Sequence, residues 1–426
     1  MSEPRPGRWS RRALIGGVVS IAGGAAYVGV HRRDRGGAHS EYFLRVSRAL
    51  AAAGIARPVM VIDRVRLAAN VAAVRQTLVG TKLATRIVVK SLPVPRLLEE
   101  VSAGLETNRC MVFNGPMVLD TLKWRPAADL LLGKPLPAAE VARVLDAHPM
   151  VAAARPQWLG DSIPRLRDYA AVARARGIKL RVSLEIDVGL HRGGLAGPAD
   201  VAAALDAIAG MPELQFSGLM GYDPHVPKMP RPEAAYQAVV ESYRAALDVV
   251  RSRATSETKA GLTLNTAGSP TYRLHVADPN ANEVAIGSAF LKPRDFDLET
   301  LSHHVPAAFI ATPVLKVVDP LRIPGLEALG GVFRALDANA ERGFFVYGGH
   351  WLAEPESPPG LEYSSIYGRS SNQELLTGSR NVPLRPDDYV FLRPNQSEAV
   401  LLQFGDILVY ENGAITDRWP TFPVSA

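Results

Sequence analysis

The lysine at position 90 is one of two features whose residue types point to chemistry. Lys90 closes the apolar run of residues 87–89, Ile-Val-Val. Burial disfavours the charged form of an amine and lowers its pKa, and a lowered pKa suits imine formation with an aldehyde. A lysine that merely marks where a strand reaches solvent fits this segment equally well.

An acidic, apolar stretch about a hundred residues later is the second feature. Residues 184–194 read Leu-Glu-Ile-Asp-Val-Gly-Leu-His-Arg-Gly-Gly. Glu185 and Asp187 alternate with apolar residues, so we expect both carboxylates on one face of a strand. Arg192 follows, placed to hydrogen-bond an anionic or aromatic-nitrogen ligand. A polar layer inside a barrel, with an internal ion pair, is the structural alternative.

Three later segments add small or polar residues directly after expected strands. Residues 265–271 read Asn-Thr-Ala-Gly-Ser-Pro-Thr, and residues 285–288 read Ala-Ile-Gly-Ser. In barrels, the late strand-to-helix loops often hold a phosphate through backbone N–H groups and hydroxyls. Residues 221–225, Gly-Tyr-Asp-Pro-His, add a phenol and an imidazole. Each segment alone also fits an ordinary turn.

Short apolar strands alternate with helices through the first two thirds of the chain. The strands are expected at residues 58–62, 86–90, 111–113, 129–132, 151–154, 179–186, 214–220, 262–265 and 282–286. About eight such alternations predict an α/β fold whose parallel strands close into a (β/α)8 barrel of the TIM type. A doubly wound open sheet is the alternative, and it is disfavoured because no Gly-x-Gly-x-x-Gly follows the first strand.

The pattern changes after residue 306. Helical periods almost vanish, and short β-rich runs appear between glycine, proline and asparagine turns. We therefore predict a separate, mainly β domain. The chain divides into an N-terminal segment of residues 1–40, a barrel of residues 41–300 and a C-terminal β domain of residues 301–426.

The N-terminal segment has the features of a targeting signal. It is basic through Arg12, apolar over residues 13–30, and basic again at residues 32–33. Residues 10–15, Ser-Arg-Arg-Ala-Leu-Ile, resemble a twin-arginine export signal. A plain inner-membrane anchor is the alternative, since this apolar run is barely long enough to span a bilayer. We expect a periplasmic or other extracytoplasmic protein that meets the membrane only through this segment.

The positive charge of the chain does not indicate a nucleic-acid partner. The formal net charge is +6, but residues 1–42 hold seven arginines against three acidic residues. The excess therefore belongs mostly to the N-terminus, and no basic patch is interleaved with aromatic residues. The single cysteine, Cys110, excludes an intrachain disulfide and a multi-cysteine zinc site. Its apolar surroundings favour a packed thiol over a nucleophile.

Taken in order, these segments resemble the alanine-racemase-like, fold-type III pyridoxal-phosphate enzymes, and among them the D-threonine aldolase and D-serine dehydratase branch. That branch carries Arg-Pro-His-x-Lys, and residues 86–90 keep its arginine and lysine but lose Pro-His. The other matches are residues 187–192 with Asp-Val-Gly-x-x-Arg, 218–225 with Gly-x-x-Gly-Tyr-x-x-His, 267–271 with the phosphate loop, 283–288 with Glu-x-x-x-Gly-Thr, and Trp419-Pro420 near the end. The motifs are specific as an ordered set, and the resemblance covers roughly residues 57–420.

The resemblance implies a barrel that holds pyridoxal 5'-phosphate, with the β domain closing over its mouth, often against a second subunit, so we expect a homodimer. Lys90 would be the Schiff-base lysine and the base at Cα, and Arg86 belongs to the same motif. Arg192 would face the cofactor ring, and Tyr222 would lie near the imine. The phosphate would be held by Gly268, Ser269, Gly287 and Ser288.

One segment departs from the branch. Its members carry Pro-x-His-x-Cys or Pro-x-His-x-Asp, which binds a divalent metal, whereas residues 394–399 read Pro-Asn-Gln-Ser-Glu-Ala. Gln396 is a poor ligand for a transition metal, and Glu398 alone gives a weak site. We expect no metal here, which puts in doubt the step in which that metal polarises the β-hydroxyl of the substrate.

The function expected from these residues is a pyridoxal-phosphate lyase acting at Cα and Cβ of a small amino acid, D-configured or β-hydroxylated. An amino-acid racemase and a cofactor-binding protein without turnover are alternatives. An unrelated barrel, with Glu185 and Asp187 as acid and base, is the third. If Lys90 does not carry the cofactor, another lysine such as Lys134 must do so.

Overall fold

The computed structural model describes residues 33–253, 261–278, 280–322, 325, 337–364, 367–398 and 400–424. Residues 10–15 and 13–30, which carry the predicted export signal, lie outside this part of the chain. No helix within the described ranges has both the length and the apolar character needed to cross a membrane.

Two compact units make up the chain. The barrel unit comprises the described residues within Met60–Phe309 and Pro394–Ala426, and the β unit comprises those within Met1–Val59 and Ile310–Arg393. Each unit combines stretches far apart in the sequence. The segment that contains Glu398 therefore belongs to the same unit as Lys90.

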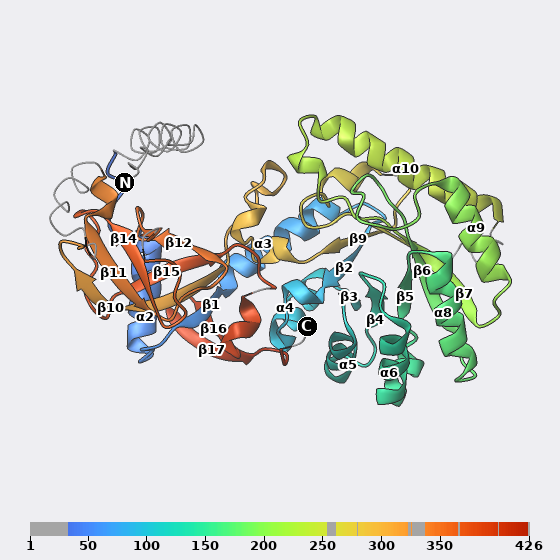
Figure 1. Cartoon of the computed structure of the whole chain (residues 1–426), viewed down its shortest axis with the longest axis horizontal. Coiled ribbons are helices and arrows are strands. Elements are labelled where there is room, and N and C mark those ends of the chain that lie inside the picture. The colour runs from blue at the N-terminus through green and yellow to red at the C-terminus, as the bar shows by residue number, and fades with distance from the viewer. Residues whose placement is uncertain are drawn as a thin grey trace, which may run out of the picture. The chain divides into compact units, whose positions relative to one another are not determined.

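Eight parallel strands close into a barrel, as the sequence predicts (Figure 1). They are β2 (Ala84–Val88), β3 (Arg109–Val112), β4 (Asp129–Leu132), β5 (Gln157–Gly160), β6 (Leu180–Glu185), β7 (Leu214–Met220), β8 (Thr263–Thr266) and β9 (Glu283–Ile286). The ring is closed by β2 and β9, where Ala84 pairs with Glu283 and Ile87 with Ile286. A barrel of this kind brings all the loops after its strands to one end.

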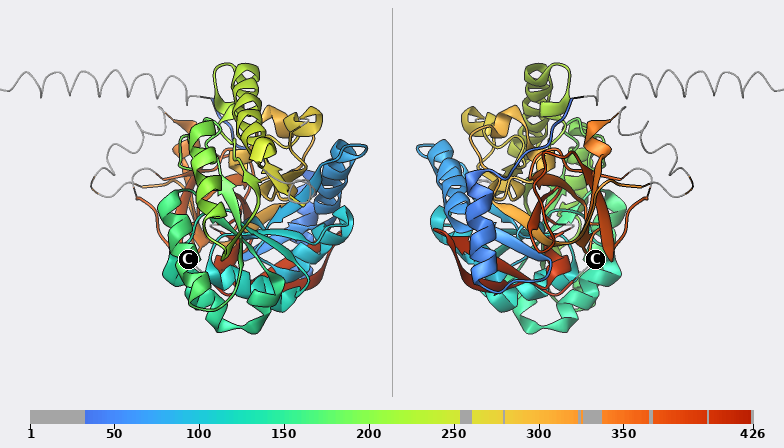
Figure 2. Two further views of the ribbon diagram at one scale, coloured as in Figure 1. Left: turned by 90° about the vertical axis from the view of Figure 1, so that its right-hand side faces the viewer. Right: turned by 90° about the vertical axis from the view of Figure 1, so that its left-hand side faces the viewer.

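Helices surround the strands of the barrel, as the left-hand view of Figure 2 shows. They are α3 (Arg64–Leu78), α4 (Pro95–Leu105), α5 (Gly115–Trp124), α6 (Ala138–Ala147), α7 (Pro149–Ala154), α8 (Ile163–Arg174), α9 (Pro198–Ala209) and α10 (Pro232–Arg253). Several begin with local sequence signals. The side chains of Asn114 and Ser162 accept hydrogen bonds from backbone N–H groups three residues ahead, and a proline follows within two residues.

Short 3-10 helices lie in the segments that follow β2, β7, β8, β9 and β15. They are η1 (Val89–Ser91), η2 (Val226–Lys228), η3 (Leu274–Ala277), η4 (Ser288–Phe290), η5 (Arg294–Phe296), η6 (Glu299–Leu301) and η9 (Leu401–Phe404).

One predicted strand lies outside the barrel, and another is a helix. The run at 58–62 forms β1 (Val59–Asp63), which lies outside the barrel and pairs in parallel with β16 (Asp406–Glu411), Met60 opposite Ile407. An apolar run buried on both faces does not say which sheet it joins. Residues 151–154 lie in α7 because alanine favours helix, and the strand follows as β5.

The end of the chain packs on the barrel unit. The strand β16 pairs with β17 (Ala414–Pro420) as an antiparallel hairpin, and Trp419 stands opposite Ile407. Beyond the hairpin, the backbone N–H of Phe422 donates to the carbonyl of Pro93 at 2.8 Å. These contacts fix the C-terminal segment beside the loop that follows β2.

The β unit is mainly antiparallel sheet, which confirms the second part of the predicted fold. Its elements are α2 (Glu41–Ala52), β10 (Ala308–Val318), η8 (Ala338–Ala340), β11 (Arg342–Tyr347), β12 (Ala353–Ser357), β13 (Glu362–Tyr363), β14 (Gln373–Gly378) and β15 (Tyr389–Pro394). In the sheet, β11 lies between β10 and β14. The N-terminal helix packs on it through Phe43, whose ring centroid is 4.8 Å from that of Phe391.

Candidate functional site

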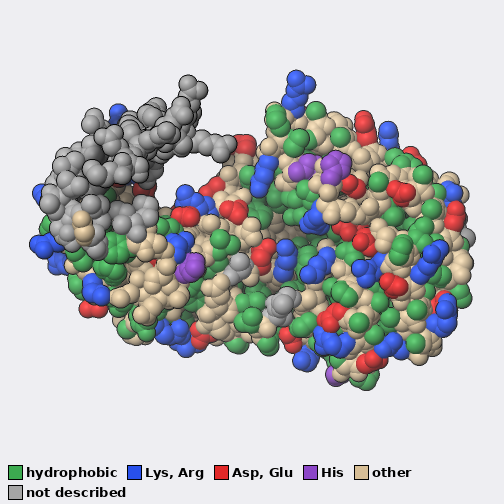
Figure 3. All heavy atoms as spheres, in the orientation of Figure 1, with side chains coloured by type: hydrophobic (Ala, Val, Ile, Leu, Met, Phe, Trp, Pro, Cys, Tyr) green, Lys and Arg blue, Asp and Glu red, His purple; other side chains and the backbone are tan. Residues whose placement is uncertain are grey.

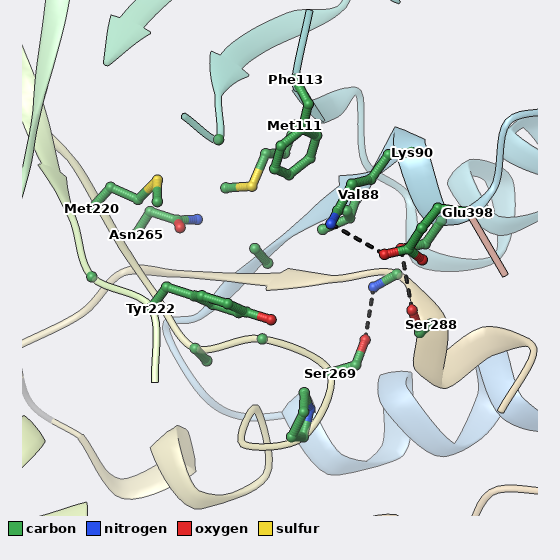
Figure 4. A pocket seen from close by; sticks show the side chains of 18 of the residues that line it. Val88, Lys90, Met111, Phe113, Met220, Tyr222, Asn265, Ser269, Ser288 and Glu398 are labelled. Atoms are coloured by element: carbon green, nitrogen blue, oxygen red, sulfur yellow. Dashed lines mark hydrogen bonds and ion pairs between the residues drawn. The ribbon is translucent and has the colours of Figure 1, made fainter. Parts of the chain in front are cut away.

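A cavity of about 650 Å³ opens at the carboxyl ends of the barrel strands. Its walls come from the loops after β2, β7, β8 and β9, from β3, and from the segment around Glu398 (Figure 4). A concave site at the carboxyl ends of barrel strands is where a cofactor or a small ligand commonly binds. The cavity brings together seven of the predicted site residues: Lys90, Arg192, Tyr222, Gly268, Ser269, Gly287 and Ser288.

Lys90 lies in η1, directly after β2, at the mouth of the cavity. Its Nζ is 3.2 Å from Oε1 of Glu398 and 4.8 Å from the centroid of the Phe113 ring. The side chain is 39% exposed, so the burial inferred from the apolar run is only partial. The amine is therefore accessible from the cavity.

Glu398 reaches the cavity from the segment after β15. The backbone N–H of Asp295 donates to the carbonyl of Asn395 at 3.1 Å, and a turn from Ser397 to Leu401 follows. One carboxylate oxygen of Glu398 faces Lys90, while the other, Oε2, is buried and has no hydrogen-bond partner among the described residues. The sequence marked Glu398 only as a weak metal ligand, and its place beside Lys90 could not be read from residues so far apart.

Among the described residues, the surroundings of Gln396 offer no cluster of metal-binding side chains. Its Nε2 donates to Oδ2 of Asp295 at 3.1 Å in an exposed hydrogen bond, and it is not among the described residues that line the cavity. Glu398 is then the only carboxylate in the described lining, which contains no histidine or cysteine. One carboxylate is a poor donor set for a transition metal.

Three serine hydroxyls gather at the end of the cavity near β9. Oγ of Ser269 accepts hydrogen bonds from the backbone N–H groups of Gly287 and Ala289 at 3.0 and 3.1 Å. Oγ of Ser288 donates to Oγ of Ser91 at 3.2 Å. Hydroxyls and backbone N–H groups beside a short helix are the groups that bind phosphate. Ser91, next to Lys90, was not predicted, because nothing in its local sequence distinguishes it from a surface serine.

Two glycines keep this end of the cavity open. A Cβ on Gly268 would lie 2.5 Å from the ring of Tyr222. A Cβ on Gly287 would lie 2.7 Å from the side chain of Val88 and 2.8 Å from that of Ser91. Side chains at these positions would displace the walls, so the glycines make the close approach of three loops possible.

A buried charged network holds the loop that carries Gly268. Oγ1 of Thr271 donates to Oδ1 of Asp223 at 2.5 Å. The other oxygen of Asp223 is 2.8 Å from Nε2 of His275, whose Nδ1 is 3.1 Å from Asp278. Burial by itself lowers the pKa of His275, but the hydrogen bonds to the two carboxylates outweigh it and raise the pKa to about 9. The imidazolium therefore ties the loops after β7 and β8 together at neutral pH.

Arg192 and Tyr222 form the wall opposite Lys90. The guanidinium carbon of Arg192 is 5.0 Å from the Tyr222 ring centroid, and its NH2 is 3.7 Å from Oε1 of Glu185. Burial raises the pKa of Tyr222 to about 12, so its phenol stays protonated and can donate a hydrogen bond. Figure 4 shows the hydroxyl of Tyr222 pointing into the cavity.

Glu185 and Asp187 have separate surroundings. The strand β6 ends at Glu185, and Asp187 belongs to the turn that follows. Its Oδ1 accepts from the N–H groups of Gly189 and His191 at 2.9 and 3.0 Å, and Oδ2 is 2.8 Å from Nδ1 of His191. Asp187 thus shapes the turn that presents Arg192, which does not favour an acid–base pair of these two carboxylates.

Arg86 is the predicted site residue that does not line the cavity. It fills the barrel interior, where its Nε is 2.5 Å from Oε1 of Glu283 and its NH2 is 3.1 Å from Oδ2 of Asp129. Arg109 adds a third contact, 2.8 Å from Oε2 of Glu283. The partners of Arg86 are protein groups, so its assignment as a cofactor contact stays a prediction. Beside it, burial raises the pKa of Cys110 to about 11, as expected for a packed thiol.

The barrel matches the model of a known protein family. The model of the alanine racemase N-terminal domain matches residues 62–294, more than half of the chain. The chain belongs to this family. Its members are pyridoxal-phosphate enzymes, racemases and lyases among them, which confirms the resemblance drawn from the ordered motifs.

Solved structures show the same fold at low sequence identity. D-threonine aldolase from Filomicrobium marinum superposes with a TM-score of 0.68 and 16% identity, covering 85% of this chain and 94% of that one. D-threo-3-hydroxyaspartate dehydratase from a Delftia species gives 0.66 and 16%, covering 86% and 98%. Alanine racemase from Bacillus anthracis gives 0.63 and 13%, also covering 86% and 98%. No curated protein matches the sequence.

Proposed function

We propose that this protein is a pyridoxal-phosphate lyase that acts at Cα and Cβ of a β-hydroxy amino acid, D-configured by analogy with the aldolase and dehydratase that share its fold. The observation that carries the proposal is the pairing of Lys90 with Glu398 at 3.2 Å, in a cavity whose far end is lined with serine hydroxyls. An amine and a carboxylate beside one ligand can move protons at neighbouring carbon atoms.

The cavity fits pyridoxal phosphate. Ser91, Ser269 and Ser288 would hold the phosphate, and Gly268 and Gly287 leave the space it needs. The accessible amine of Lys90 would bond to the aldehyde, as lysines do in pyridoxal-phosphate enzymes. Bound there, the cofactor would supply an electron sink for charge that develops at Cα.

The protein groups around the cavity would then carry the protons. Lys90 would take or return the proton at Cα of the substrate. Tyr222 would donate a hydrogen bond from its protonated phenol. Arg192, whose guanidinium carbon is 5.0 Å from the centroid of the Tyr222 ring, would hold that ring in place. We propose that no divalent metal takes part, because Glu398 stands alone as a ligand of the kind such ions bind.

The proposal is tested with the purified protein and added pyridoxal phosphate. We expect a visible absorbance band, loss of that band in Lys90→Ala, and release of aldehyde or 2-oxo acid from D-threonine or D-serine at the same rate with and without a chelator. A control variant, Lys134→Ala, should keep the band, because Lys134 is exposed in a neighbouring groove. Interconversion of D- and L-alanine without either product would make the protein a racemase, and the absence of any band would contradict both.

A further inference from the structure

The second oxygen of Glu398 is the feature that the proposed function leaves unexplained. Its Oε1 is held by Lys90 at 3.2 Å, whereas Oε2 is buried without a hydrogen-bond partner in the described parts of the chain. A buried carboxylate oxygen without a partner costs free energy, and folded proteins rarely leave one in that state. Oε2 is therefore placed to meet a donor that the protein itself does not provide.

The position of Glu398 is built rather than incidental. Its segment is fixed on one side by the hydrogen bond between Asp295 and Asn395, and on the other by the turn in which the N–H of Leu401 donates to the carbonyl of Ser397 at 3.0 Å. Figure 4 shows the carboxylate pointing into the cavity, towards Nζ of Lys90. The backbone on both sides thus holds the carboxylate against the lysine.

Distance limits what this carboxylate can reach. Lys90 must approach Cα of a bound amino acid to move its proton, and the oxygen on Cβ is only two bonds from Cα. A carboxylate in contact with the amine of Lys90 is therefore within reach of that oxygen. Glu398 is the only carboxylate in the described lining of the cavity. Glu185, near Arg192, and Asp161 lie in the adjoining groove, which shares Lys90 and Glu398 with the cavity, and among these three carboxylates only Glu398 has a hydrogen bond with Lys90.

We propose that Glu398 is the acid–base catalytic residue at the β-oxygen of the substrate and that it exchanges this proton with Lys90. The inference rests on the proposed lyase function and adds the group that moves the second proton. It also explains the departure at residues 394–399, because a carboxyl group here does by proton transfer what a cation would do by polarisation.

The protons balance in both lyase reactions. In elimination, the proton leaves Cα for Nζ of Lys90, passes to Glu398 and ends on the β-oxygen as the bond between Cβ and oxygen breaks; the electron pair of the former Cα–H bond forms the double bond between Cα and Cβ, and water departs. In cleavage the relay runs the other way. Glu398 takes the proton of the β-hydroxyl, the bond between Cα and Cβ breaks to release an aldehyde, and Lys90 delivers the proton to Cα.

The test uses the variant Glu398→Gln, which keeps the size of the side chain. It measures exchange of the Cα hydrogen separately from product release, which reports the reaction at Cβ. We expect the visible band of the bound cofactor to remain, exchange of the Cα hydrogen in deuterated water to stay within a few-fold of the unsubstituted protein, and release of aldehyde or 2-oxo acid to fall by about 100-fold or more. Glu398→Asp, which restores an acid on a shorter arm, should recover part of the lost rate.

The control is Gln396→Ala, two residues away and outside the cavity lining, which should change neither step. Product release in Glu398→Gln at the unsubstituted rate would overturn the inference, and so would an equal loss of Cα exchange, since Glu398 would then act only through Lys90. Cα exchange in the unsubstituted protein without any Cβ product would overturn it too, but would leave a pyridoxal-phosphate enzyme standing. Failure of the unsubstituted protein to bind the cofactor would instead remove the proposed function itself.

Discussion

Arg86 and Glu283 form an ion pair inside the barrel, with both side chains at 0% exposure. Two arginines, Arg86 and Arg109, share Glu283, and Asn265 donates to it at 2.7 Å. Charges taken out of water in this way are tolerated only when each finds its partners, because the desolvation of an unpaired ion is not offset. Glu283 therefore holds the polar interior of the barrel together beneath the cavity.

Substituting Glu283 by glutamine leaves both arginines short of negative charge in the interior. We expect the free energy of unfolding to fall by about 3–5 kcal/mol, measured by chemical denaturation. The control is Glu99→Gln, which removes the exposed pair of Glu99 with Arg96 and should cost at most about 1 kcal/mol. Equal denaturation midpoints for Glu283→Gln and Glu99→Gln would show that the buried ion pair does not stabilise the barrel.

Single residues were predicted where their neighbours in sequence carry the signal. Lys90 closes an apolar run, and Gly268 and Gly287 stand in small-residue loops, so their chemistry is local and all three line the cavity. Arg86 was placed with the cofactor by its motif, yet its direction into the barrel depends on Glu283 and Asp129, far away in the sequence. The contact of Lys90 with Glu398 likewise exists only through the fold.

At the scale of elements, the loops after β7 and β8 depend on His275 in η3. Asp223 from the first loop and Asp278 beyond η3 flank its imidazole, and Tyr236 of α10 lies edge-on at 5.1 Å between ring centroids. The pKa of His275 is raised from 6.5 to about 9 in the folded protein. A raised pKa means that the protonated form is bound more tightly in the folded state, so its stabilisation is complete below the unfolded pKa and is lost as the pH rises through about 9.

We therefore expect the free energy of unfolding to decline between about pH 6.5 and pH 9, by up to about 1.4 kcal/mol per pH unit from this group. His275→Gln, which cannot become charged, should be less stable at neutral pH and should lack this decline. Denaturation at several pH values measures it. His148→Gln, at an exposed histidine, serves as the control and should keep the decline. The same slope in the His275 variant would contradict the account.

Elements were predictable where pattern and length agree. Alternating strands and helices gave the barrel, whereas β1 was assigned to it although it pairs with β16. That pairing joins residues more than three hundred positions apart, and the apolar run of β1 contains no sign of its partner. Residues 151–154 were misread because a short apolar run does not separate helix from strand.

On the scale of the whole molecule, the barrel and the mainly β sheet follow from the sequence, because both depend on periodic patterns of apolar residues. The barrel unit takes back residues 394–426 after the β unit, so the segment that bears Glu398 returns to the barrel. Figure 3 shows acidic and basic side chains interspersed over the visible face of the barrel unit. The export signal, the homodimer and the predicted domain boundaries stay predictions.

The proposed function requires one covalent bond, between Lys90 and the cofactor. Borohydride reduction of the protein loaded with pyridoxal phosphate, followed by peptide mass spectrometry, locates that bond directly. The account predicts a single pyridoxyl-modified peptide, the one that contains Lys90. Modification at Lys134 or at any other lysine, with Lys90 unmodified, would contradict it.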